Sequence, residues 1–282
     1  MKNLGYYNGI VCPLEELMIP VGDRAVYFGD GVYEAVGIRN KIPFGLGDHI
    51  DRFYNSMAQM RIDFSMSKEE LQELLLSLIE KLSDFSAEHG MYWQATRGGG
   101  FRRHAFPEDA KSNLLVTIVP SPFQKFGEKI CMITAEDKRA LMCNVKTLNL
   151  VPNILAKQMA VEAGCYDAIL HRGEIVTEGT HHNVSILKDG VYRTHPANNL
   201  ILHGITRKHH LELCRKNGIP VLEKEFTLAE LFDADEVIVT NCVTLCAVAV
   251  KINQKDVGGR DPELLERIIS LYREKFEKET SK

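Results

Sequence analysis

The sequence predicts a mixed α/β or α+β protein of two domains, and three observations support this. The chain has 282 residues, which is enough for two ordinary domains. Segments with the alternation of strands and segments with the period of helices occur in both halves. Between the halves, Pro120-Ser121-Pro122 resists both a helix and a central strand. We therefore expect an N-terminal α/β domain over 1–119, a linker over 120–126 and a C-terminal domain over 127–282.

The N-terminal half shows both patterns. Strands are expected over 6–12, 18–21, 33–39, 42–44, 91–97 and 113–119, helices over 48–60 and 67–82, and a polar loop over 23–30. The second helix begins with a capping box, in which Ser67 and Glu70 can each satisfy a free amide. Asn40-Lys41 is typical of a hairpin turn.

The C-terminal half repeats the mixture. Strands are expected over 166–170, 174–177, 184–187, 191–194, 236–240 and 247–252, and helices over 153–163, 206–216, 228–232 and 262–278. Gly164 follows the first of these helices, where glycine commonly ends a helix. Lys188-Asp189-Gly190 is typical of a hairpin between the strands on either side.

Composition and charge exclude several classes of protein. Apolar residues make up 45% of the chain and charged residues 26%, as in soluble globular proteins. The net charge of −4 lacks the basic footprint of a nucleic-acid-binding protein. No apolar run approaches the roughly 20 residues that span a bilayer, so no membrane partner is expected. The first residues lack the apolar stretch of an export signal, so a cytoplasmic location is expected.

The seven cysteines predict free, buried thiols. Their number is odd, and no pair forms a C-x-x-C motif. Free thiols fit a reducing compartment. No pair has the spacing of a zinc finger or ribbon, so no metal site is expected.

Three features, in this order, are the parts needed to hold pyridoxal 5'-phosphate (PLP). Lys146, with the apolar neighbours Val145 and Leu148, can form a Schiff base. Glu178 can keep the pyridine nitrogen protonated. The turn 204–206 opens a helix, whose free amides suit a phosphate. The plainer alternatives are a solvated lysine, a turn carboxylate and an ordinary N-cap at Thr206.

Two further basic features accompany them. Arg52 lies beside the apolar stripe of its helix and could bind the phosphate with two parallel hydrogen bonds, or pair with Asp48 or Asp51 at the surface. The glycine-rich run 97–104 carries three arginines and His104, which suits the capture of a carboxylate. A solvated basic loop is the alternative.

These residues resemble the fold-type IV PLP-dependent aminotransferases over nearly the whole chain. The runs 28–34, 49–52, 146–150, 174–179 and 198–207 each resemble a segment of that family, and they occur in the family's order. The resemblance implies that Arg52 binds the cofactor phosphate, Lys146 forms the Schiff base and Glu178 meets the pyridine nitrogen. It also implies cofactor contacts from a second set of residues, namely Asn183, Leu202, Ile205 and Thr206.

Within the family, the chain is most similar to D-amino-acid aminotransferases. Arg102 and His104 match the R-x-H pair that binds the substrate carboxylate in that group, and Tyr33 matches a tyrosine that completes the site. The Gly-Asn-Tyr run expected after the lysine of a branched-chain aminotransferase is missing. Two segments depart from the family: His181-His182 replaces small hydroxyl residues, and Asn241-Cys242 interrupts a Ser/Thr-rich segment.

The resemblance implies a small N-terminal α/β domain, a larger pseudo-barrel C-terminal domain and a homodimer. It implies transfer of an amino group from a D-amino acid, with D-alanine first, to a 2-oxo acid such as 2-oxoglutarate. The alternatives are a 4-amino-4-deoxychorismate lyase or a branched-chain-type aminotransferase of the same fold. A PLP-binding protein without activity is a further alternative, because the two departures lie near the cofactor.

Overall fold

The computed structural model describes residues 2–83 and 88–281, which form two compact units. Unit 1 contains residues 1–123, 145–149 and 279–282, and unit 2 contains residues 124–144 and 150–278. Residues 145–149, with Lys146 among them, therefore pack with the N-terminal unit although they follow the first strand of the other. The predicted N-terminal domain 1–119, linker 120–126 and C-terminal domain 127–282 concern segments that fold independently. This division stays a prediction.

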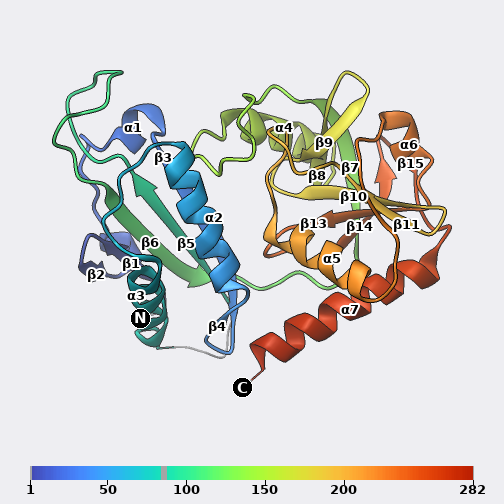
Figure 1. Ribbon diagram of the computed structural model, residues 1–282, viewed down its shortest axis with the longest axis horizontal. Coiled ribbons are helices and arrows are strands. Elements are labelled where there is room, and N and C mark those ends of the chain that lie inside the picture. The colour runs from blue at the N-terminus through green and yellow to red at the C-terminus, as the bar shows by residue number, and fades with distance from the viewer. Residues whose placement is uncertain (1, 84–87, 282) are drawn as a thin grey trace. The chain divides into compact units, whose positions relative to one another are not determined.

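Unit 1 is built on one antiparallel sheet (Figure 1). Its strands, in the order β2-β1-β6-β5-β3-β4, are β2 (Ile10–Cys12), β1 (Leu4–Tyr7), β6 (Asn113–Pro120), β5 (His89–Thr96), β3 (Gly31–Arg39) and β4 (Ile42–Pro43). Its helices are η1 (Leu14–Glu16), α1 (Arg24–Phe28), α2 (Leu46–Gln59) and α3 (Lys68–Glu80). The predicted capping box of α3 and the positive φ angles of Asn40 and Lys41 at the β3–β4 turn are confirmed.

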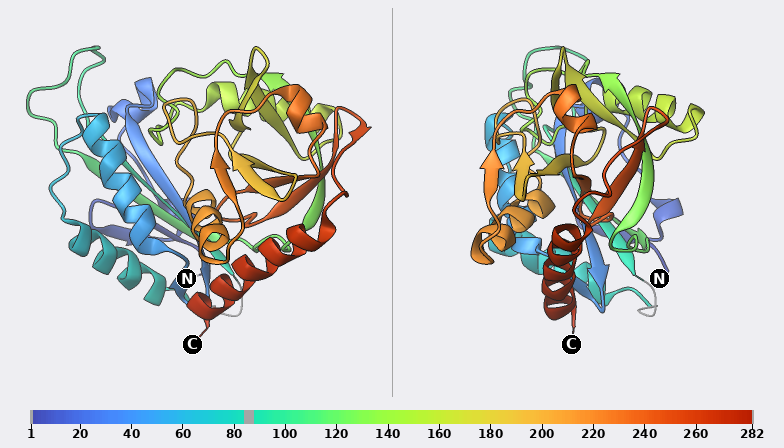
Figure 2. Two further views of the ribbon diagram at one scale, coloured as in Figure 1. Left: turned by 45° about the vertical axis from the view of Figure 1, so that its right-hand side comes forward. Right: turned by 90° about the vertical axis from the view of Figure 1, so that its right-hand side faces the viewer.

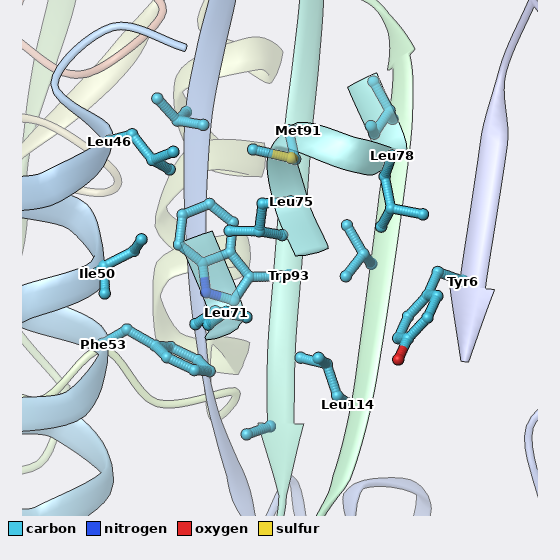
Figure 3. Packing of buried hydrophobic residues seen from close by; sticks show 14 of the residues in the cluster. Tyr6, Leu46, Ile50, Phe53, Leu71, Leu75, Leu78, Met91, Trp93 and Leu114 are labelled. Atoms are coloured by element: carbon cyan, nitrogen blue, oxygen red, sulfur yellow. The ribbon is translucent and has the colours of Figure 1, made fainter. Parts of the chain in front are cut away.

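The core of unit 1 lies between this sheet and the helices α2 and α3. Apolar residues three and four apart on each helix face the sheet, as their spacing predicts. Trp93 of β5 is fully buried among Phe53 of α2 and Leu71 and Leu75 of α3 (Figure 3). Phe53 meets the Trp93 ring edge-on at a centroid distance of 5.9 Å, a favoured aromatic geometry.

Three predictions in unit 1 are wrong. The strand expected over 6–12 is divided between β1 and β2, which pair with each other, because the chain turns at Asn8 and Gly9 with positive φ angles. No strand forms over 18–21, where Met18 and Val21 are 82% and 73% exposed and so have no buried face to pack. The expected loop over 23–30 contains α1, because Asp23 accepts a hydrogen bond from the Ala25 amide at its start and Gly29 ends it in the left-handed conformation.

Unit 2 is built on a nine-stranded mixed sheet. Its strands are β12 (Val221–Glu223), β11 (Val191–Thr194), β10 (Asn183–Lys188), β13 (Glu236–Thr240), β14 (Ala247–Ile252), β7 (Glu128–Glu136), β8 (Asp167–Arg172) and β9 (Ile175–Gly179) in sheet order, with β15 (Lys255–Asp256) paired to β14. β9 and β10 are separated in that order by four strands, yet residues 180–182 alone connect them. The sheet must therefore curl back on itself, which confirms the expected pseudo-barrel.

Four helices accompany this sheet (Figure 2). They are α4 (Val151–Glu162), α5 (Ile205–Lys216), α6 (Leu228–Phe232) and α7 (Pro262–Thr280). Leu211 of α5 and Ile268 of α7 are buried against Leu187 of β10 in one apolar cluster. Among the residues with an assigned position, no helix is long and apolar enough to cross a membrane.

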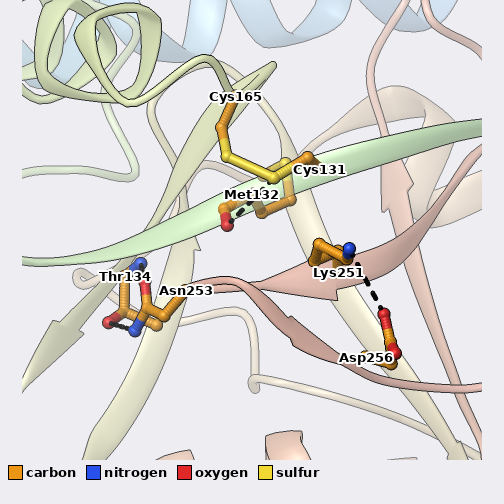
Figure 4. Close-up of a disulfide and its surroundings, with 7 residues drawn as sticks. All are labelled: Cys131, Met132, Thr134, Cys165, Lys251, Asn253 and Asp256. Carbon is orange, nitrogen blue, oxygen red and sulfur yellow. Dashed lines mark hydrogen bonds and ion pairs between the residues drawn. A yellow bond between two sulfur atoms is a disulfide. The ribbon is translucent and has the colours of Figure 1, made fainter.

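The cysteine prediction is wrong for one pair. Cys131 on β7 and Cys165, two residues before β8, form a disulfide with their Cα atoms 4.9 Å apart (Figure 4). The cause is tertiary, because β7 and β8 pair in parallel with Met132 opposite Asp167 and so bring the two residues together. The other five cysteines lie outside this disulfide, and of these only Cys214 and Cys246 are fully buried.

Candidate active site

In unit 1, Lys146 is held against β3 and α2. The Tyr33 amide donates to the Lys146 carbonyl at 2.9 Å, and the Leu148 amide donates to the Gly31 carbonyl at 3.1 Å. The Lys146 amide donates to Ser56 Oγ on α2 at 3.3 Å. The segment therefore pairs with β3 at an isolated antiparallel bridge, with Thr147 opposite Val32, which fixes the backbone from which the lysine projects.

The ammonium group of Lys146 lies over an aromatic ring. Its Nζ atom is 4.1 Å from the centroid of Tyr33, and the Tyr33 ring stacks on Tyr92 at 5.4 Å. Lys146 is partly buried, so an apolar wall and an open side are both present. A lysine with these surroundings is ordered yet accessible to a carbonyl compound, as a nucleophilic lysine must be.

Arg52 is fixed by a buried carboxylate that the sequence did not indicate. Its Nε and Nη2 atoms donate to the two oxygens of Glu34 at 2.6 and 2.8 Å. His49 Nδ1 lies 2.7 Å from Glu34 Oε2. Burial alone would raise the pKa of Glu34, but Arg52 and His49 outweigh it and hold the pKa well below its usual range. Glu34 is thus an anion that orients the guanidinium of Arg52.

His49 links Arg52 to Lys146 electrostatically. Burial lowers the pKa of His49, Glu34 raises it, and the charges of Arg52 and Lys146 lower it again. The net direction is downward, so the ring is neutral at pH 7 and donates Nδ1–H to Glu34. The sequence predicted Arg52, Tyr33 and Lys146 separately. In the structure the charges of Arg52 and Lys146 both act on His49, and the Lys146 ammonium lies over Tyr33.

The glycine-rich run has two different parts. Arg97 is buried, where its guanidinium binds both oxygens of Asp30 and donates to the Met60 and Arg61 carbonyls. It is therefore a structural residue of unit 1 and not a carboxylate trap.

Arg102 and His104, by contrast, are exposed and lie against Phe28, 5.3 and 5.5 Å from its ring centroid. Within residues 2–83 and 88–281, neither forms a hydrogen bond to Tyr33, so the structure does not assemble the three predicted substrate residues.

In unit 2, Glu178 at the end of β9 is the centre of a polar cluster. Its oxygens accept from the Asn183 side-chain amide at 2.9 Å and from the Leu202 amide at 3.0 Å. Arg139 donates to it through Nη1. Burial raises the pKa of Glu178 to about 7, although Arg139 and the Leu202 amide both lower it. A carboxyl group with this pKa can share a proton with a basic ring nitrogen near neutral pH.

Arg139 was not predicted from the sequence. Its Nε and Nη2 atoms donate to Asp137 at 2.9 and 2.8 Å, and Nη2 also donates to the Leu200 carbonyl at 3.2 Å. Arg172 binds the same Asp137 carboxylate at 3.1 Å. This framework holds Arg139 against Glu178. Sequence reasoning could have looked for such an arginine, because a buried glutamate needs a cationic partner.

The start of α5 is arranged for an anion. Gly204 is its N-cap and provides no side chain to bond the first-turn amides, to which Ile205 and Thr206 belong. A Cβ at Gly204 would lie 1.9 Å from Asn183 Oδ1, so only glycine permits this close approach. The free amides and the positive end of the helix dipole favour a phosphate. The predicted residues Glu178, Asn183, Leu202, Ile205 and Thr206 thus come together in unit 2.

The titration of Glu178 yields a testable stability change. Its pKa rises from 4.5 to about 7 on folding, so the folded protein binds the extra proton between these values. Stability from this group is present below pH 4.5 and is lost as pH rises to about 7, by about 3 kcal/mol. We expect the cofactor-free wild type to lose this amount relative to Glu178→Gln between pH 4.5 and 7, measured by urea unfolding. A difference independent of pH would contradict the raised pKa.

The residues around Lys146 in unit 1 and those around Glu178 in unit 2 both fit PLP. An ordered lysine, a carboxyl group poised near neutral pH and a helix start without a capping side chain match its aldehyde, its ring nitrogen and its phosphate. The model of the family described as amino-transferase class IV matches residues 31–252. Class IV aminotransferases use this cofactor.

Curated relatives and solved structures agree with this match. The chain is 45% identical to the D-alanine aminotransferase of Listeria monocytogenes serotype 1/2a (strain 10403S) over 83% of its own length and 82% of that protein's. It is 40% identical to the D-alanine aminotransferase of Bacillus licheniformis over 91% and 90% of the two chains.

Among solved structures, the branched-chain amino acid aminotransferase from Escherichia coli has a TM-score of 0.87 at 22% identity, covering 100% of this chain and 96% of that one. At this identity the likeness is one of fold. By the family match and by the identities to the curated relatives, the chain belongs to the class IV aminotransferases.

Proposed function

We propose that this protein is a D-alanine aminotransferase, which moves the amino group of a D-amino acid to a 2-oxo acid such as 2-oxoglutarate. What carries the proposal is 40–45% identity to D-alanine aminotransferases over more than four fifths of the chain. The sequence adds the Arg102 and His104 pair that distinguishes this group within the family.

PLP, when bound, supplies an electron sink that allows the Cα–H bond of an amino acid to break. In this proposal Lys146 holds the cofactor covalently in the resting enzyme and then carries the proton away from Cα. Glu178 keeps the proton on the ring nitrogen, with Arg139 fixing the carboxylate. Arg52 and the amides of Ile205 and Thr206 bind the phosphate. Asn183 and Leu202 position Glu178 through the hydrogen bonds described above.

A substrate panel tests the activity. Purified holoenzyme is mixed with D-alanine, L-alanine or 4-amino-4-deoxychorismate, with 2-oxoglutarate as acceptor, and pyruvate and glutamate are measured. We expect pyruvate and D-glutamate from D-alanine alone. Turnover of L-alanine would favour a branched-chain-type enzyme, and pyruvate from aminodeoxychorismate without an acceptor would favour the lyase. No reaction with any of them would favour the binding protein without activity.

Arg102 provides a sharper prediction about the substrate. We expect Arg102→Leu to raise the KM for D-alanine about ten- to a hundredfold, because loss of a charge-assisted hydrogen bond to a carboxylate costs roughly 1.5–3 kcal/mol. The affinity for PLP should change little. Steady-state kinetics and a cofactor titration measure the two quantities. Arg103→Leu, an exposed neighbour in the same loop, is the matched control. Equal kinetics in the wild type and Arg102→Leu would contradict the carboxylate trap.

We further propose that the protein acts as a homodimer, as the resemblance implies. Helix α4 supports an association surface, because five large apolar residues on it are 53–65% exposed: Val151, Ile154, Leu155, Met159 and Val161. Its opposite side is buried through Ala156 and Ala160. An apolar patch of this kind on a globular protein typically marks a contact with another chain. A cytoplasmic location remains the expectation from the sequence.

The dimer is tested on α4. We expect Ile154→Glu or Leu155→Glu to convert a dimer into a monomer, because each places a charge in a desolvated apolar contact. Light scattering coupled to gel filtration gives the mass. Gln72→Glu adds the same charge at an exposed polar position of α3, outside this patch, and should leave the mass unchanged. A wild type that is monomeric, or charged variants that remain dimeric, would exclude α4 as the interface.

A further inference from the structure

Asp167, His181 and His182 of unit 2 bring three metal-binding atoms within 4.8 Å of one another. Asp167 begins β8, whereas the two histidines lie in the connection between β9 and β10. His182 Nδ1 is 2.8 Å and His181 Nδ1 is 3.4 Å from the same carboxylate oxygen, Asp167 Oδ2. Two imidazoles and one carboxylate therefore converge on one point.

The two inner groups are fixed by surrounding hydrogen bonds. The Asp167 and His182 side chains are both 0% exposed. The Thr180 hydroxyl donates to Asp167 Oδ1 at 2.6 Å, which turns the other oxygen toward the two rings. His182 Nε2 lies 3.1 Å from Thr244 Oγ1. If an ion replaces the proton on His182 Nδ1, the ring proton moves to Nε2, where the Thr244 hydroxyl can accept it, as outer partners of metal-bound histidines do.

The remaining features favour a cation with an open coordination position. A neutral imidazole is the form that binds a metal ion. His181 is 46% exposed and gives the group an opening to solvent. Lys157 is a cation near this group of ligands, and its ammonium donates to the Tyr166 carbonyl. The Asp167 carboxylate accepts from the Thr180 hydroxyl through one oxygen and faces both rings with the other, so it offers an acceptor oxygen to a cation.

We propose that Asp167, His181 and His182 form a binding site for a divalent transition metal ion, Zn²⁺ first, with water as a further ligand. Two nitrogens and one carboxylate oxygen with an open position suit Zn²⁺ and its neighbours and do not suit Mg²⁺ or Ca²⁺, which prefer oxygen. The site uses no cysteine, so the cysteine spacing that led us to expect no metal does not bear on it. Nor does it use any residue that is proposed to hold PLP or substrate.

Metal titration of the holoenzyme tests the proposal. The protein carries no affinity tag and is dialysed against chelator and then against metal-free buffer, which also removes unbound PLP. Zn²⁺ binding is measured by calorimetry, and Co²⁺ binding by its visible spectrum. We expect one ion per chain and the intense Co²⁺ bands of four-coordinate geometry. We expect Mg²⁺ not to compete.

Variants identify the ligands. His181→Ala removes an exposed side chain and should weaken Zn²⁺ binding about tenfold or more, with the fold retained by circular dichroism. His171→Ala removes another histidine of unit 2, whose Nδ1 atom instead lies 2.8 Å from the Gly173 carbonyl, and should bind like the wild type.

Absence of saturable binding, equal affinity in His181→Ala, or a six-coordinate Co²⁺ spectrum would overturn the site. Transamination of D-alanine is measured separately, so the metal site and the proposed activity fail independently.

Discussion

Lys146→Ala is expected to abolish transamination and to remove the visible absorbance of bound PLP. The proton transfer at Cα alone is worth about 10²–10⁴ in rate, and loss of the covalent attachment adds to this. The structure supports this choice of lysine, because its backbone is bonded on both sides to β3 and to Ser56 of α2, and its ammonium lies over Tyr33.

Borohydride reduction followed by peptide mapping locates the attachment in the wild type. We expect the label within the peptide that contains Lys146. Lys68→Ala is the matched control in the same unit, because Lys68 is half exposed, pairs with Asp51 and, like Lys146, lies over a tyrosine ring, that of Tyr54. Label on another lysine, or full activity of Lys146→Ala, would reject the assignment.

Local patterns predicted most of the fold and failed where tertiary contacts decide. The capping box of α3 and the β10–β11 hairpin are set by neighbouring residues, so the sequence predicts them. β7 was not predicted, although Ile130 and Met132 alternate with less buried residues as a strand requires. Its place between β14 and β8 in the sheet depends on parallel partners from distant parts of the chain.

The residues of the candidate site also include some that the sequence predicts and some that it does not. Lys146, Glu178 and the start of α5 could be predicted, because motifs of the family mark them along the chain. Glu34, His49 and Arg139 could not, since their roles arise from burial beside a charged partner that is distant in sequence. The two departures from the family are also linked only in the structure, where His182 of the first contacts Thr244, two residues after Cys242 of the second.

Glu178→Gln is expected to retain PLP and to lose most of its activity, by about a thousandfold in kcat. A neutral amide no longer holds a proton on the ring nitrogen, so electrons from the breaking Cα–H bond are less stabilised. Each unit by which the pKa of that nitrogen falls corresponds to about 1.4 kcal/mol, and three units give about 4 kcal/mol. The amide oxygen can still accept from Arg139 and from the Leu202 amide, whereas the hydrogen bond that Asn183 donates to the other oxygen is lost.

Steady-state kinetics with D-alanine measures kcat, and a cofactor titration measures the affinity for PLP. Glu236→Gln is the matched control, because Glu236 is another buried glutamate of unit 2 and accepts from the Asp261 amide. It should retain wild-type kcat. If Glu178→Gln loses PLP together with activity, the carboxylate contributes to binding and not chiefly to the chemical step. If it keeps near-wild-type kcat, the ring nitrogen needs no proton from this residue, and the role proposed for Glu178 and its partner Arg139 is wrong.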